Sequence, residues 1–239
     1  MQKLSVFGAA AVAALAMTLA ATGAQATQLV NNGDFATGDF TGWTLFATTN
    51  GTAGFYPDPQ VTAFDVTGNG ASSAAEFQVG QANLSTLQEG GGIRQTLNAT
   101  AGLLTFSADF ASYLSQDLNL SGGVFSVLLD GVVLDSFNTG VIGTGFSGPI
   151  GGPLTPVPAF ERGTLAFSTN VTAGSHILAL QVTRPFPIGG SGPLQYFDNI
   201  SAVQAGVVPE PATWGLMILG FGFAGGSLRR RARLAARAV

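Results

Sequence analysis

The chain has no cysteine and a single histidine, and charged residues make up 9% of its 239 positions. The absence of cysteine excludes disulfides, thiolate metal sites and a cysteine nucleophile. The one histidine, His176, lies in an alternating apolar and polar segment typical of a strand, where a structural role is the common one. A general base also needs an arranged partner, and the sequence indicates none for His176.

Signatures of catalysis are equally scarce. There is no G-x-S-x-G motif or other nucleophile signature. Composition alone does not exclude a Ser–His–Asp triad. A carboxylate pair for glycoside hydrolysis needs two acids about 5–10 Å apart, which sequence spacing does not show. Asp130 and Asp135 are explained by a hairpin and its solvent face. We predict no catalytic residue and no enzymatic activity, with a secreted hydrolase as an alternative.

Basic residues are rare away from the two ends. Positions 27–208 hold twelve acidic residues, the thirteen of the chain without Glu210, and three basic ones, Arg94, Arg162 and Arg184. Three minus twelve gives a formal charge of −9 for this segment, although the whole chain sums to −4. Such a surface repels nucleic-acid phosphates and suits divalent cations. We expect no nucleic-acid partner.

The first of two long apolar runs lies at the N-terminus. It combines Lys3 with an apolar stretch over 4–21 and small residues at Ala24 and Ala26. This order is that of a secretory signal peptide cleaved after Ala26. The alternative is a permanent membrane helix. We expect residues 1–26 to be removed and the mature protein to leave the cytoplasm.

The second apolar run, over 214–228, is fifteen residues long. A bilayer crossing needs about 20 residues, so this short hydrophobic helix is marginal as a permanent anchor. Pro209 and Pro211 before it favour an extended, unpaired chain that a processing enzyme can grip. The arginine-rich tail over 229–237 resists crossing the membrane and should stay cytoplasmic.

The order of these C-terminal features resembles the PEP-CTERM sorting signal over 207–233, with a PEPxxW motif at 209–214. Its motif residues here are Pro209, Glu210, Pro211, Trp214, Arg229, Arg230 and Arg231. The resemblance implies an exosortase-type processing enzyme as partner and a Gram-negative host, often one that makes exopolysaccharide. It also implies transient anchoring in the inner membrane, followed by a cell-surface or extracellular location. An ordinary tail anchor is the alternative.

The body of the chain, residues 27–206, reads as many short strands separated by turn residues. Asp130-Gly131, between two apolar arms, predicts a tight hairpin turn. The Gly- and Pro-rich segment 139–160 predicts a long loop. The pattern favours an all-β antiparallel sandwich or barrel. The predicted strand segments are 61–66, 74–79, 92–97, 103–114, 124–137, 165–171 and 176–182.

Three segments of the body resemble the galactose-binding-like jelly rolls, which include many carbohydrate-binding modules. They are the opening "LVNNGDFATGDFTGW" (29–43), "TAGSHILALQV" (172–182) and the closing "LQYFDNISAVQ" (194–204). The resemblance implies a jelly-roll sandwich with Trp43 in its core. An aromatic in a strand pattern more often belongs to a core than to a sugar platform.

The same resemblance implies a structural calcium ion between the first and last strands. Calcium takes six to eight oxygen ligands. Asp198 matches the position in the last strand. At the opening the corresponding position is Ala36, and Asp34, two residues earlier, is the second candidate. The alternative is that both aspartates cap turns. No other cofactor is expected.

The adjacent aromatics Phe55 and Tyr56, beside Pro57 and Pro59, are predicted as exposed ligand contacts. The sequence as a whole predicts an exported, exosortase-processed surface or extracellular-matrix protein whose non-catalytic sandwich associates with exopolysaccharide. A carbohydrate-binding module with a defined glycan ligand is an alternative.

Overall fold

The computed structural model describes residues 26–54, 57–116, 120–147, 155–156, 158–187, 192–206, 215, 218–226 and 229. The chain divides into two compact units, which we treat separately. One is the body, Ala26–Gly206, and the other combines Met1–Gln25 with Val207–Val239.

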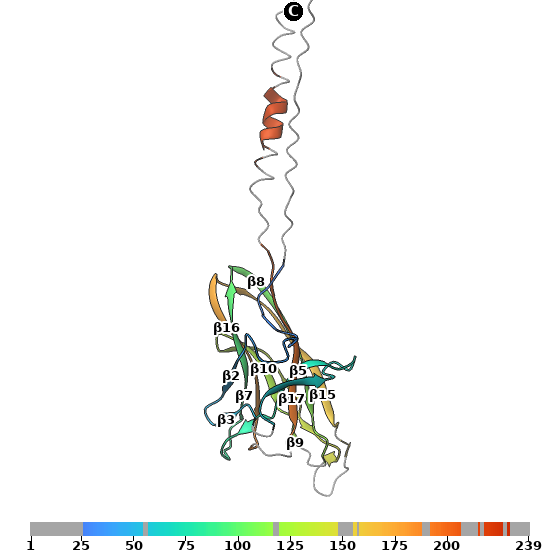
Figure 1. The fold of residues 1–239 in the computed structure, drawn as a ribbon. Helices are drawn as coiled ribbons and strands as arrows, with labels where there is room; N and C mark the ends of the chain where they lie inside the picture. Colours follow the sequence, from blue (N-terminus) through green and yellow to red (C-terminus); the bar gives the residue numbers. More distant parts are fainter. Residues whose placement is uncertain are drawn as a thin grey trace, which may run out of the picture. The chain divides into compact units, whose positions relative to one another are not determined.

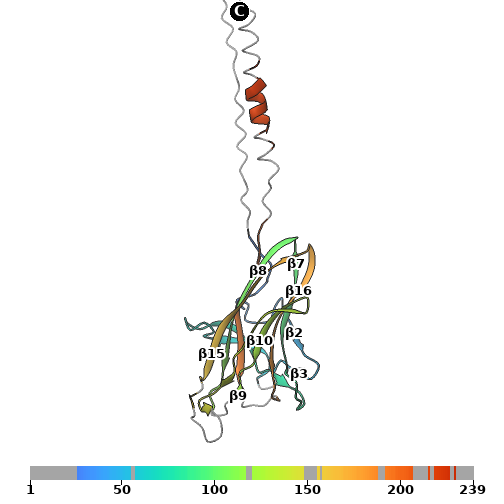
Figure 2. The same ribbon diagram turned by 180° about the vertical axis from the view of Figure 1, so that it is seen from behind.

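The body is an antiparallel β-sandwich of two main sheets (Figures 1 and 2). The first sheet has the order β15 (Phe160–Val171), β8 (Gly102–Tyr113), β17 (Leu194–Gln204), β5 (Ser72–Phe77) and β4 (Gln60–Phe64), with β1 (Thr27–Gln28) also on β17. The second has the order β11 (Val132–Asn138), β10 (Val124–Leu129), β16 (Gly174–Arg184), β7 (Glu89–Ala99) and β2 (Thr44–Ala47).

Three short pairs lie beside these sheets. They are β12 (Val141–Ile142) with β9 (Leu120–Ser121), β13 (Phe146–Ser147) with β14 (Thr155–Pro156), and β3 (Gly51–Thr52) with β6 (Gly80–Gln81). Two of these pairs include parts of the Gly- and Pro-rich segment predicted as a long loop, and residues 148–154 of that segment lie outside the described residues.

The long strands cross repeatedly from one sheet to the other, as in a jelly roll. The chain passes from β7 to β8, from β15 back to β16, and from β16 to β17. The predicted all-β jelly-roll sandwich is confirmed. The two ends of the body are also paired, since Thr27 lies opposite Gln204.

Apolar side chains from both sheets fill the space between them. On β16, Leu178, Leu180 and Val182 are buried, and the residues between them face outward. Across the core, the Phe125 ring stacks on Phe110 with centroids 4.5 Å apart. Aromatic pairs of this kind add to the stabilisation that burial alone provides.

The predicted hairpin is present between β10 and β11. Asp130 has φ 51° and Gly131 has φ 81°. Two successive positive φ angles define the tight turn that matches the twist of antiparallel strands, and glycine adopts them at little cost.

The opening segment, 29–43, is a series of turns fixed by side chains. The Asn32 amide donates to the carbonyls of Asp39 and Thr41, both at 3.0 Å. The Trp43 indole N–H donates to the Asn32 carbonyl at 3.0 Å. Trp43 is buried in the core, as the resemblance implied.

In the second unit, a short helix covers residues 218–226. Within the described part of the chain, no helix has both the length and the apolar character needed to cross a membrane.

Candidate functional site

Two adjoining hollows lie on the outer face of the second sheet. One, of about 510 Å³, is lined by residues of β2, β7 and β16 and by Gly42. The other, of about 410 Å³, extends over β10 and the Asp130-Gly131 turn. Arg94 and Ile177 line both hollows, so these two side chains stand where the hollows meet.

Three glycines of β7, Gly90, Gly91 and Gly92, are buried beside these hollows. Gly92 lies opposite Phe46 on β2 and Gln181 on β16. A Cβ atom on Gly92 would lie 1.9 Å from the Leu180 carbonyl oxygen, closer than any side chain tolerates. Glycine is therefore required here for the close approach of the neighbouring strand.

Arg94 is the central polar group of this face. On β7, Arg94 is paired with Thr44 of β2 on one side and with Ala179 of β16 on the other, and its side chain is exposed. The guanidinium carbon is 5.9 Å from the centre of the Phe46 ring. Among the described residues, no hydrogen bond or ion pair involves the guanidinium group. Its donors therefore face solvent.

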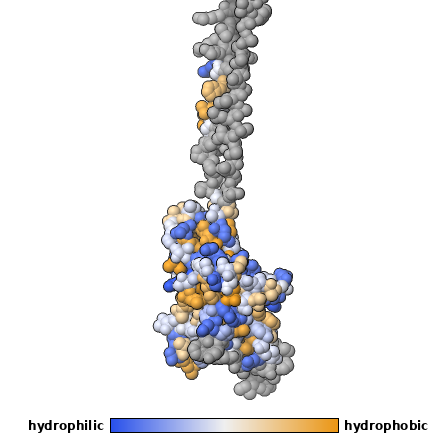
Figure 3. Space-filling model, in the orientation of Figure 1, coloured by the Kyte–Doolittle hydropathy of each residue, from blue (hydrophilic) through white to orange (hydrophobic). Residues whose placement is uncertain are grey.

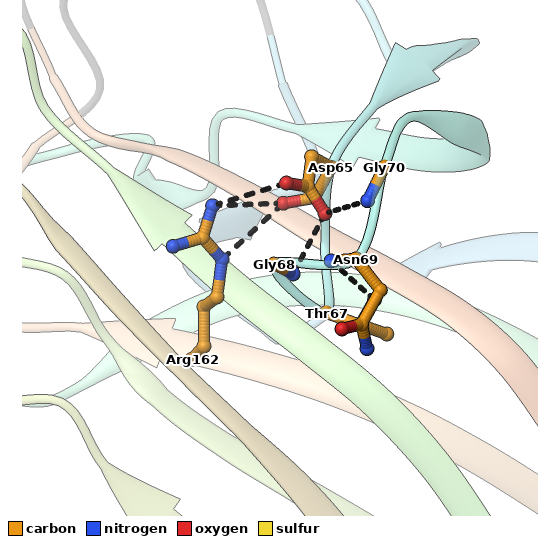
Figure 4. A network of polar contacts seen from close by, with 6 residues as sticks. All are labelled: Asp65, Thr67, Gly68, Asn69, Gly70 and Arg162. Atoms are coloured by element: carbon orange, nitrogen blue, oxygen red, sulfur yellow. Dashed lines mark hydrogen bonds and ion pairs between the residues drawn. The ribbon is translucent and has the colours of Figure 1, made fainter.

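The other two arginines of the body are already engaged. Figure 4 shows Arg162 of β15 reaching the 65–70 loop, where its Nη2 donates to the Asp65 carbonyl at 3.0 Å. The Asp65 carboxylate in turn accepts from the backbone of Gly68 at 2.7 Å and Gly70 at 3.2 Å. Arg184 is buried, and burial lowers its pKa to about 10.

His176 forms a pair with Asp130 at the edge of the second hollow. His176 Nδ1 lies 2.7 Å from Asp130 Oδ2, and Nε2 lies 3.0 Å from the Thr172 carbonyl oxygen. Both ring nitrogens thus face acceptors, and only the protonated ring donates to both. The hydrogen bond with Asp130 makes the largest contribution to raising the pKa of His176, and the hydrogen bond with the Thr172 carbonyl adds to it. The hydrogen bond from His176 in turn lowers the pKa of Asp130.

Asp198, the first predicted calcium ligand, is buried in β17 beside Ser72 and Asp109. Its carboxylate accepts hydrogen bonds from the Ser72 hydroxyl and, at 2.7 Å, from the Asn199 backbone. Burial raises its pKa, and the nearby charges of Asp109 and Asp34 act in the same direction. Asp34, the second candidate, is exposed.

The structure thus brings Asp198 and Asp34 into one region, but their surroundings are not those of an evident ion site. Within the described ranges, no three histidine, cysteine or acidic side chains are grouped so that they could hold a metal ion. Each carboxylate oxygen of Asp198 already accepts one hydrogen bond, so calcium would share these oxygens with Ser72 and Asn199, and backbone or amide oxygens would have to complete its shell. Calcium binding at Asp198 stays a prediction.

The other predicted site residues have varied positions. Phe55 and Tyr56 lie outside the described residues, as do Ala24 and most of the sorting motif (Pro209, Glu210, Pro211, Trp214, Arg230 and Arg231). Ala26 and Arg229 are exposed.

Over the face drawn in Figure 3, apolar and hydrophilic residues of the body are interspersed.

Two features of this face were not predicted from the sequence. Phe46 and Arg94 were not identified as candidates, although alternation in 92–97 already placed Arg94 on the side opposite Ile93. The sequence also did not indicate a partner for His176, because Asp130 is distant in sequence and meets it only through the pairing of β10 with β16.

Comparison with known proteins identifies the C-terminal segment. Residues 207–231 match the PEP-CTERM protein-sorting motif. The chain therefore carries this motif, as its residue order indicated, and the motif indicates exosortase-dependent export. A search of curated proteins found no match.

Several solved β-sandwich structures resemble the body. They include TmCBM61 in complex with β-1,4-galactotriose, at 12% identity and TM-score 0.40, covering 74% of this chain and 99% of that one. The CBM22-1 xylan-binding domain of Paenibacillus barcinonensis Xyn10C has 13% identity and TM-score 0.40, covering 79% and 99%. A cyclase from Fischerella sp. TAU has 13% identity and TM-score 0.39, covering 75% and 97%. At these values the likeness does not indicate what this chain binds or catalyses.

The calcium prediction can be tested by thermal unfolding. If an ion binds Asp198, added calcium should raise the melting temperature of the chain and EDTA should reverse the rise, because a ligand of the folded state stabilises it. Asp198→Asn should remove the response, and Asp58→Asn, a substitution of another aspartate outside this region, should keep it. A melting temperature that neither calcium nor EDTA changes would contradict calcium binding.

The His176–Asp130 pair predicts a pH dependence of stability. A raised histidine pKa stabilises the fold below the unfolded value of about 6.5, and this contribution is lost as pH rises through the folded pKa. A lowered aspartate pKa stabilises above about 3.9. Urea unfolding should show the free energy of unfolding of the wild type falling by about 0.5 kcal/mol between about pH 5 and pH 8 relative to His176→Gln, a small value because the pair is near the surface. Parallel pH profiles of the two proteins would refute this.

Proposed function

We propose that this chain is an exported, exosortase-processed protein of the cell surface or extracellular matrix, and that its non-catalytic sandwich binds glycan, including host exopolysaccharide. It leaves the cytoplasm through an N-terminal signal peptide, residues 1–26, in a Gram-negative host. The sorting segment, 207–233, holds it transiently in the inner membrane, where an exosortase-type enzyme cleaves it. The sorting motif supports the export route.

The observation that carries glycan binding is the outer face of the second sheet. A sugar ring has apolar C–H faces and a rim of hydroxyls, so its site combines aromatic or bare surface with polar side chains. Here the half-buried Phe46 ring lines the second hollow, and Arg94 and Gln181 in the same hollow provide hydrogen-bonding groups. The two adjoining hollows favour several consecutive sugar units over a single one.

The residues of this face favour binding over hydrolysis. Glycoside hydrolases of the common kind place two carboxyl groups about 5–10 Å apart across the scissile bond. Asp130 is the one carboxylate among the described residues that line the two hollows, and it is paired with His176. Nε2 of His176 is likewise occupied by the Thr172 carbonyl. A binding module is therefore the better account than a secreted hydrolase.

The processing half of the proposal predicts a defined mass. Protein recovered from the envelope and medium of the host should lack residues 1–26 and the segment beyond about Pro209, because both are signals consumed during export. Intact-mass spectrometry measures this directly. Arg229→Gln combined with Arg230→Gln and Arg231→Gln should block processing. Retention of the arginine tail in the wild-type protein would refute exosortase cleavage and leave a membrane-anchored domain.

If the sandwich binds glycan, the protein should migrate more slowly in native gels that contain host exopolysaccharide than in gels without it. Phe46→Ala should weaken this binding by about ten-fold, since stacking of one ring contributes on the order of 1–1.5 kcal/mol. Phe160→Ala is the matched control, because Phe160 is a partly exposed phenylalanine of the first sheet, outside the two hollows. Equal loss in both variants, or migration unaffected by any glycan, would contradict a site on the second sheet.

A further inference from the structure

We infer that the glycan bound by this protein carries carboxylate groups, and that Arg94 pairs with one of them. The inference rests on the proposed glycan-binding function and names the chemical class of the ligand. The structural basis is the position of Arg94 where the two hollows meet, with no hydrogen-bonded or ion-paired acceptor among the described residues.

Positive charge is scarce in the body. The body has three arginines against twelve acidic residues, counted over 27–208. Arg162 is bound to Asp65, and Arg184 is buried, with Nε donating to the Ser121 carbonyl at 2.8 Å and Nη1 to the Val79 carbonyl at 3.0 Å. Arg94 alone of the three has no acceptor among the described residues. It is also the one that lines the hollows.

Covering Arg94 with a ligand costs desolvation free energy. A chain lying across both hollows must pass over this side chain and remove water from its guanidinium group. Desolvating a charge without giving it a partner is unfavourable by several kcal/mol. A ligand that covers Arg94 must therefore bring acceptors. Sugar hydroxyls supply single neutral acceptors, whereas a carboxylate accepts two parallel hydrogen bonds from the planar guanidinium and cancels its charge.

The described side chains around Arg94 are uncharged or already paired. Its neighbours in the sheet, Thr44 and Ala179, are uncharged, and the carboxylate lining the same hollow, Asp130, is held by His176 and the Ile177 backbone N–H. No described acidic side chain thus competes for Arg94. The rest of the body is strongly acidic, so a chain with a carboxylate on every residue is repelled. The ligand class is therefore a glycan in which uronic acids, or other acid-bearing sugars, are spaced by neutral ones.

The experiment begins with the full chain, purified in mild detergent, on an array of neutral and uronic-acid-containing oligosaccharides. The tightest-binding glycan is then compared with its carboxyl-reduced form, which keeps the size, linkage and hydroxyl pattern. Calorimetry should show binding to the acidic form that is about ten- to a hundred-fold tighter than to the reduced form, as expected for one charge-assisted bidentate contact. Added sodium chloride should narrow this difference.

Three variants connect the preference to Arg94. Arg94→Gln should bind both forms of the glycan equally, and Arg94→Lys, which keeps the charge without the planar fork, should keep part of the preference. Arg162→Gln removes the same charge from the first sheet and should keep the full preference. Because Arg94 is exposed, its variants should melt within a few degrees of the wild type, which separates loss of binding from loss of folding.

Each other outcome is decisive. Tightest binding to neutral glycans, or equal binding of the acidic and reduced forms, would overturn the carboxylate inference and leave glycan binding intact. A preference for the acidic form that survives in Arg94→Gln would overturn the role of Arg94. Failure to bind any glycan would instead overturn the proposed function itself.

Discussion

The pairing of β7 with β16 is the contact on which both the core and the candidate site depend. The two strands are in continuous antiparallel register from Ala99 opposite Gly174 to Glu89 opposite Arg184. This register sends Ile93 into the core and leaves Arg94 outside. A slip of one residue would reverse every side chain, burying a guanidinium and exposing the apolar row. The stability of the sandwich and the composition of its outer face are therefore fixed by the same set of hydrogen bonds.

The body has no cysteine and therefore no disulfide. Several buried polar side chains instead connect its strands through hydrogen bonds. Gln195 accepts from the Val79 backbone at 2.9 Å and donates to the Gly122 carbonyl at 3.1 Å. Arg184 meets the same two segments through Val79 and Ser121. Such groups satisfy backbone atoms where the strands end, and they are stabilising only while their hydrogen bonds are complete. They explain why the buried Arg184 is tolerated with no carboxylate partner among the described residues.

Sequence patterns identified most of the strands because alternation and turn residues are local signals. The Asp130-Gly131 hairpin was predicted at its observed position from such signals, whereas the closing strand at 194–204 was expected only from the resemblance to the jelly rolls. The opening segment around Asn32 was harder, since its turns are fixed by side-chain hydrogen bonds rather than by a periodic pattern. The candidate site was not predicted, because Phe46, Arg94 and Gln181 become neighbours only through the order of β2, β7 and β16. Local periodicity indicates which face a residue occupies, and the identity of its neighbours depends on topology.

The charge distribution connects the sorting signal to the binding face. Arginines at the C-terminus serve the sorting segment, so their removal on processing would leave a strongly acidic body. That body is repelled by anionic surfaces at distances within the screening length, about 8–10 Å in physiological salt. At contact distance, Arg94, which has no acceptor among the described residues, offers a local attraction that the average charge does not show. If Arg94 contacts the ligand as we infer, long-range repulsion combined with this short-range cationic contact selects a ligand with sparse negative charge over a densely charged polymer.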